Sequence, residues 1–124
     1  MADKKTVLIV EDDKKYRTIL VKLLTAEGIT TQTAADGVEA LQKLKGNTQI
    51  DLIILDLLMP RMSGWNFMYE IQKIPSRNIP IIILTNLTAL SYPSEVPVQL
   101  DLMMKANVSI DEVVKKVKKH LMLE

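Results

Sequence analysis

Residues 52–55 (LIIL) form an unbroken apolar run between two aspartates, Asp51 and Asp56. This pattern is typical of a strand that is covered on both faces within a parallel sheet. A carboxylate at the end of such a strand lies at the carboxyl edge of the sheet, where open α/β folds bind ligands. A lone aspartate at that position is more often a cap or a solvated turn residue, so Asp56 needs support from other segments.

Further strands are predicted at residues 7–10, 81–84 and 100–104, and a short, less apolar one at 29–34. Helical patterns follow four of the five strands. One helix is expected to end at Gly28, one to open with a capping box at residues 36–39, one to begin near Ser63, and the last to open with a capping box at residues 109–112. Repeated strand-crossover-strand units are right-handed, which predicts an α/β fold, a doubly wound five-stranded parallel sheet with helices on both faces. The residues expected to face the core from these helices are Tyr16, Ile19, Leu20 and Leu23; Val38, Leu41 and Leu44; Trp65, Met68 and Ile71 or Tyr69; and Ile110, Val113, Val114, Val117 and Leu121.

The segment 87–99 breaks this regularity. Pro93 and Pro97 cannot lie inside a regular helix, and Pro93 disfavours the helical conformation of Tyr92. At most one or two helical turns fit, so we expect a shortened or atypical fourth helix.

Composition limits the function further. With 124 residues the chain is expected to form a single domain, 1–124, and its net charge of +1 indicates neither nucleic-acid nor acidic-membrane binding. Cysteine is absent, and the only histidine, His120, is expected to be a solvated surface residue of the last, lysine-rich helix. No apolar stretch approaches the about 18 residues of a membrane span and no signal peptide is recognisable, so a cytoplasmic protein is expected.

Five polar groups lie within a residue or two of the predicted strand ends: Glu11, Asp12, Asp56, Thr85 and Lys105. Each has a structural explanation when taken alone, but the carboxyl ends of four parallel strands share one edge, so these side chains should converge. Asp12 and Asp56, with a loop carbonyl, offer the hard oxygen ligands that Mg²⁺ prefers, and Glu11 can hold the waters of the metal. Asp56 is then a competent nucleophile towards phosphorus, with Lys105 and Thr85 placed to stabilise phosphoryl charge.

The segments 10–13 (VEDD), 55–64 (LDLLMPRMSG), 84–85 (LT) and 104–105 (MK) resemble the receiver domain of two-component response regulators, in the right order along the whole chain. The resemblance implies a flavodoxin-like fold with strand order 2-1-3-4-5. It implies that Asp56 is the phosphoacceptor, that Asp12, Asp56 and the Leu58 carbonyl bind Mg²⁺ with Glu11 acting through water, and that Thr85 and Lys105 contact the phosphoryl group. The implied partners are a sensor histidine kinase or phosphotransfer protein, or a small phosphodonor, and a downstream protein that the sequence does not identify.

The chain departs from the receiver pattern at several positions. Ala106 stands where receivers usually carry a cis proline, so a trans bond after Lys105 is expected. Leu102 replaces the usual aromatic switch residue, and Asn86 is larger than the usual residue after the threonine. We therefore expect phosphorylation with an atypical response, by ordering of segment 87–99. Slow hydrolysis is also expected, because Leu58 and Leu87 stand where water would approach.

Two other interpretations of the function remain open. The chain could be a receiver-like scaffold that binds proteins independently of phosphate, which the altered segment 87–99 favours and the complete acidic and lysine set opposes. An enzymatic function is the third hypothesis. A phosphatase with an aspartate nucleophile would need a second acidic residue two positions after Asp56, and Leu58 is found there. The leading expectation is a non-enzymatic switch that accepts, and slowly hydrolyses, its own aspartyl phosphate.

Overall fold

A computed structural model describes residues 4–46, 49–59, 61–74, 79–85 and 100–123. Its five parallel strands form one sheet in the order β2-β1-β3-β4-β5, which confirms the expected topology. The strands are β1 (Thr6–Val10), β2 (Thr30–Ala34), β3 (Leu52–Leu55), β4 (Ile81–Thr85) and β5 (Leu100–Met104), each within a residue of its predicted bounds. The helices are α1 (Lys14–Ala26), α2 (Gly37–Gly46), α3 (Gly64–Ile71) and α4 (Ile110–His120), with a short 3₁₀ helix, η1 (Lys105–Asn107).

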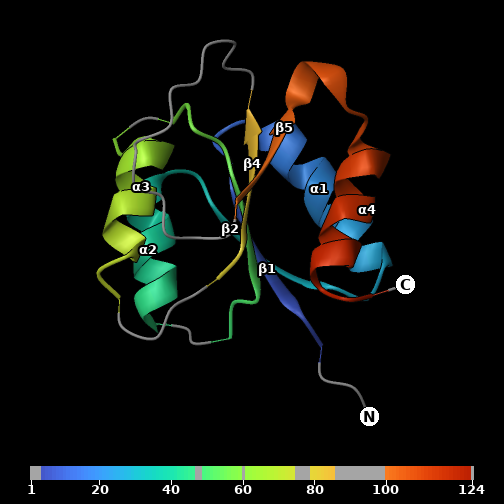
Figure 1. Ribbon diagram of the computed structural model, residues 1–124, viewed down its shortest axis with the longest axis horizontal. Coiled ribbons are helices and arrows are strands. Elements are labelled where there is room, and N and C mark those ends of the chain that lie inside the picture. The colour runs from blue at the N-terminus through green and yellow to red at the C-terminus, as the bar shows by residue number, and fades with distance from the viewer. Residues whose placement is uncertain (1–3, 47–48, 60, 75–78, 86–99, 124) are drawn as a thin grey trace.

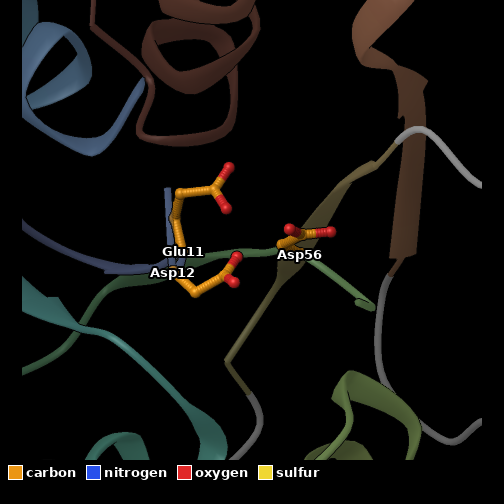
Figure 2. Close-up of side chains that lie close together, drawn as sticks. All are labelled: Glu11, Asp12 and Asp56. Carbon is orange, nitrogen blue, oxygen red and sulfur yellow. The ribbon is translucent and has the colours of Figure 1, made fainter. Parts of the chain in front are cut away.

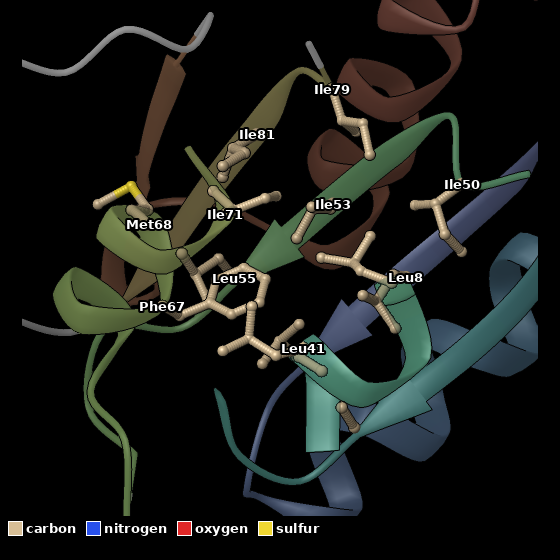
Figure 3. Close-up of a cluster of buried hydrophobic side chains, with 14 of the residues drawn as sticks. Leu8, Leu41, Ile50, Ile53, Leu55, Phe67, Met68, Ile71, Ile79 and Ile81 are labelled. Atoms are coloured by element: carbon tan, nitrogen blue, oxygen red, sulfur yellow. The ribbon is translucent and has the colours of Figure 1, made fainter. Parts of the chain in front are cut away.

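The sheet lies between two helical layers. Helices α2 and α3 cover one face, and α1 and α4 cover the other (Figure 1). The side chains of β1 and β3 alternate between two buried clusters, so the central strands are apolar on both faces, as the LIIL run predicts. Figure 3 shows the cluster beneath α2 and α3, where Leu8 and Ile53 of the sheet meet Leu41 and Phe67 of the helices.

One of the predicted core positions is wrong. Ile19 is 45% exposed, whereas Leu24 is buried; of the two alternatives given for α3, Ile71 is the buried one and Tyr69 is 60% exposed. Both the predicted and the observed residues have helical spacing, so the pattern alone did not determine which side of each helix faces the sheet.

The helix starts follow local side-chain chemistry. Both halves of the predicted capping box are present at α4, between Ser109 and Glu112. At α2 only one half forms: Asp36 Oδ1 accepts the Glu39 N–H at 2.9 Å, but the Glu39 side chain accepts from the Ala35 N–H.

His120 corrects another expectation. Its Nε2 lies 3.1 Å from Asp101 Oδ2 of β5, and its side chain is partly buried rather than solvated. Lys116 Nζ lies 3.3 Å from the same oxygen. Burial acts to raise the pKa of Asp101, but hydrogen bonds from His120 and Lys116 outweigh it and hold that pKa below its ordinary value. The contacts of Lys116 and His120 with Asp101 thus hold the C-terminal end of α4 against β5.

The structure tests only some of the expected departures from the receiver pattern. No cis peptide bond occurs in the described residues, so the bond after Lys105 is trans as expected. Leu102 is partly exposed on β5. The predictions for segment 87–99, and for Asn86 and Leu87, lie outside the described residues. None of the helices described in the structure is long and apolar enough to cross a membrane.

Candidate functional site

Strand register places the predicted groups at one edge of the sheet. Val10, the last residue of β1, pairs with Leu55 of β3, so Glu11 and Asp56 follow at the same level. The Asp56 N–H donates to the Val10 carbonyl at 3.0 Å and continues this pairing. On the other side, Thr85 of β4 pairs with Met104, the residue before Lys105. Thr85 is fully buried at this strand end.

Three carboxylates meet at this edge. Glu11, Asp12 and Asp56 each offer an oxygen, and these oxygens lie within 4.8 Å of one another (Figure 2). Glu11 and Asp56 are buried, while Asp12 is exposed to solvent. A set of oxygen donors that is partly buried and partly open suits a hard cation that keeps several of its waters.

Lys105 supplies the positive charge of the site. Its Nζ donates to Glu11 Oε1 and lies 3.5 Å from Asp56 Oδ2. Burial acts to lower the pKa of Lys105, but the hydrogen bond to Glu11 and the charge of Asp56 outweigh it, so the pKa lies above its ordinary value. The ammonium therefore remains charged across the physiological range.

Glu11 has the most perturbed electrostatics of the site. Burial raises its pKa from 4.5 to about 7; the hydrogen bond from Lys105 opposes the rise, and the neighbouring Asp56 adds to it. Backbone contacts hold the residue in place, because the Asp13 N–H donates to Glu11 Oε2 at 3.3 Å and Arg17 Nη1 donates to the Glu11 carbonyl at 2.7 Å. The Glu11 carboxylate is thus fixed and close to half-protonated near neutral pH.

The loop after β3 orients Asp56. The Leu58 N–H donates to Asp56 Oδ1 at 3.1 Å, while Oδ2 faces Lys105, so the two carboxylate oxygens differ in environment. The Gly64 N–H donates to the Leu57 carbonyl at 3.1 Å and closes the loop. A Cβ at Gly64 would lie 2.7 Å from the Leu57 Cα and 2.8 Å from the Asp56 carbonyl oxygen, so only glycine fits this approach.

The sequence reasoning missed a second anchor of this loop. Arg61 Nε lies 2.7 Å, and Nη2 2.6 Å, from Oδ2 of the buried Asp36 at the start of α2. Arg61 adopts a left-handed conformation with φ 64°, which is uncommon for a residue with a side chain. The next residue, Met62, lies against Gly37, where a Cβ would approach it to 2.9 Å. The Asp36 pKa is lowered, first by the Glu39 backbone hydrogen bond and also by Arg61.

Tyr16 was predicted only as a core residue. The structure places its ring 4.6 Å from the Lys105 Nζ, measured to the ring centroid. Neither this contact nor the Asp36–Arg61 pair has a signal in local spacing, because the partners are 89 and 25 residues apart.

Comparisons with known proteins place the chain in a family. The response regulator receiver domain matches residues 7–118. A transcriptional regulatory protein CpxR homolog from Haemophilus influenzae is 40% identical over 79 residues, which cover 64% of this chain and 33% of that protein. The chain therefore spans about a third of the length of this curated relative.

Solved structures agree over nearly the whole chain. A putative response regulator from Chloroflexus aurantiacus matches with a TM-score of 0.82 and 30% identity, over 97% of this chain and 99% of that one. Response regulator TrrA from Thermotoga maritima, solved in complex with Mg²⁺ and BeF, matches with a TM-score of 0.74 and 33% identity, over 94% of this chain and 98% of that one. This chain belongs to the receiver domain family of two-component response regulators.

Proposed function

We propose that this receiver domain is a phosphorylation switch that accepts a phosphoryl group on Asp56 in a Mg²⁺-dependent reaction. The observation that carries the proposal is the environment of Asp56: a buried carboxylate with one oxygen held by the Leu58 N–H and the other 3.5 Å from the Lys105 ammonium, beside two further carboxylates. A carboxylate placed in this way can act as a nucleophile rather than as a structural cap.

The donor set suits Mg²⁺. Asp12 and Asp56, with the Leu58 carbonyl, would hold the ion directly, and Glu11 would hold it through a bound water. All of these donors are oxygens, and one oxygen from each of the three carboxylates lies within 4.8 Å of the others, close enough to share one small ion. When bound, the ion supplies positive charge to the phosphoryl oxygens.

The chain's own residues would carry out the transfer. An Asp56 oxygen forms a bond to phosphorus while the bond from phosphorus to the leaving group of the donor breaks, and the leaving group departs with that electron pair. Lys105 would exchange its contact with Glu11 for the transferred phosphoryl oxygens. The Thr85 hydroxyl, at the end of β4, would donate to the same group.

The donors that fit this chemistry are a phosphohistidine of a sensor histidine kinase or phosphotransfer protein, and small acyl phosphates. The downstream target is a protein that the phosphorylated form recognises. Loss of the phosphoryl group by attack of water on the aspartyl phosphate would reset the switch.

Intact-mass measurement after incubation with Mg²⁺ and acetyl phosphate tests the proposal. We expect one added phosphoryl group, which is lost in Asp56→Asn and when EDTA removes the metal. Asp51→Asn is the matched control, because Asp51 lies at the opposite end of β3, where it accepts the Thr6 N–H at 2.8 Å. Absence of the added mass in the unmodified protein, or its persistence in Asp56→Asn, would contradict the proposal.

A further inference from the structure

The Lys105 ammonium is contacted from three directions. Glu11 and Asp56 approach it with carboxylate oxygens, and the Tyr16 ring lies 4.6 Å away. The side chain is only 13% exposed. Lys105 begins η1, in which no residue is buried and the next two residues, Ala106 and Asn107, are exposed. The orientation of the ammonium therefore depends on its own side-chain contacts rather than on packing of the surrounding turn.

The Tyr16 ring is itself well positioned. Tyr16 lies in the first turn of α1, where its N–H donates to Asp13 Oδ1 at 3.3 Å in the helix cap. Its side chain packs against the apolar cluster between the sheet and helices α1 and α4. Burial raises the pKa of the Tyr16 phenol above its ordinary value of 10.0, so the ring is neutral at physiological pH. A neutral aromatic face is thus held beside the ammonium.

Contacts with an aromatic face and with a carboxylate have different consequences for a lysine. A carboxylate accepts the N–H donors that a phosphoryl group would need. An aromatic ring attracts the cation through its quadrupole and leaves those donors available. The ring can therefore hold the ammonium when Lys105 leaves Glu11.

We propose that Tyr16 is a positioning residue, whose ring holds the Lys105 ammonium beside Asp56 and so increases affinity for a phosphoryl group there. This inference rests on the proposed phosphoryl acceptance at Asp56. It assigns Tyr16 no contact with the metal or the phosphoryl group; its effect passes through Lys105.

Calorimetric titration of Mg²⁺-loaded protein with beryllofluoride, a mimic of the phosphoryl group, tests the proposal. We expect Tyr16→Leu, which keeps an apolar side chain, to bind about threefold to tenfold more weakly, as loss of a partly desolvated cation–π contact predicts. Tyr16→Phe keeps the ring and should restore most of the affinity. Mg²⁺ affinity, measured alone, should be equal in all three proteins, because the ring acts through the Lys105 ammonium, which is not among the proposed metal ligands.

Two controls separate this role from a general loss of packing. Tyr69 of α3 makes a more exposed contact of the same kind with Lys73, just beyond the end of that helix, with the Nζ 4.7 Å from the ring centroid. Tyr69→Leu removes this pair, which does not involve Lys105, and should leave beryllofluoride affinity unchanged. In a Lys105→Met background, Tyr16→Leu should have no further effect, because the ring acts through the ammonium.

A readout without ligand tests the contact itself. The Tyr16 ring current should shift the NMR signals of the Lys105 ε-protons upfield, and this shift should persist in Tyr16→Phe and vanish in Tyr16→Leu. Equal beryllofluoride affinity in Tyr16→Leu and unmodified protein would overturn the inference, as would equal losses in Tyr16→Leu and Tyr16→Phe. If the unmodified protein itself binds no beryllofluoride, the proposed function fails, and the ring-current comparison still decides whether Tyr16 holds the ammonium.

Discussion

Replacing Glu11 with glutamine should change the pH dependence of stability in a defined direction. The Glu11 carboxylate is 2% exposed, and burial raises its pKa from 4.5 to about 7. The unfolded chain, in which this carboxyl group is solvated, therefore loses its proton at lower pH than the folded protein does. As pH rises from 4.5 to 7, the folded state binds more protons than the unfolded state, so the free energy of unfolding falls.

The magnitude follows from the pKa. Each whole pKa step corresponds to about 1.36 kcal/mol, so ionising Glu11 inside the fold lowers the free energy of unfolding by about 3 kcal/mol above pH 7. The other carboxyls with shifted pKa act elsewhere: Asp36 and Asp101 have lowered values, so their contributions change below about pH 4. The pKa of Lys105 is raised above 10.5, and its contribution changes only in the alkaline range.

Urea unfolding without metal, at pH 5 and pH 8, measures the effect. The unmodified protein should lose about 3 kcal/mol between these values, and most of that loss should be absent in Glu11→Gln. Mg²⁺ should stabilise the unmodified protein more at pH 8 than at pH 5, since the ion binds ionised carboxylates. Equal stability of the unmodified protein at the two pH values, or an equal loss in Glu11→Gln, would refute this reasoning.

Three further changes probe the loop after β3. Gly64→Ala should lower the free energy of unfolding by about 1–3 kcal/mol, measured by urea unfolding, because its Cβ meets the Leu57 backbone at 2.7 Å; unchanged stability would show that the loop can shift without cost. Leu58→Asn should shorten the lifetime of the phosphorylated protein, followed by intact mass, because its polar side chain can orient an attacking water; an equal lifetime would count against screening by the 54% exposed leucine. Arg61→Ala should be about 1 kcal/mol less stable than Arg61→Gly, since both lose the pair with Asp36 but only glycine adopts φ 64° freely; equal stabilities would show that the backbone there is unstrained.

The strands and their polar ends could be predicted because both signals are local. A run such as residues 52–55 is apolar on both faces, and the residue after it must lie at the sheet edge whatever the helices do. Parallel pairing in the order found then brings Glu11, Asp56 and Lys105 together. The family resemblance added the order of the strands, which spacing alone did not provide.

Contacts between distant segments could not be predicted in this way. His120 was expected in solvent, but it meets Asp101 because α4 runs back along β5, and only the packing of those elements determines the pair. Ile19 and Leu20 both fit a helical repeat of apolar residues. Which of them faces the sheet depends on the orientation of α1 about its own axis. Arg61 pairs with Asp36, 25 residues away, from a left-handed backbone conformation that is uncommon for a residue with a side chain.

The close approach of Gly64 to the end of β3 has a practical consequence. The residue that follows it, Trp65, is the only tryptophan of the chain, and its indole packs partly buried against the cluster beneath α2 and α3. Gly64 lies so close to the Asp56 and Leu57 backbone that a displacement there is expected to reach the first turn of α3. The protein thus carries its own spectroscopic probe, and we expect the intrinsic indole emission to report changes in the position of Asp56.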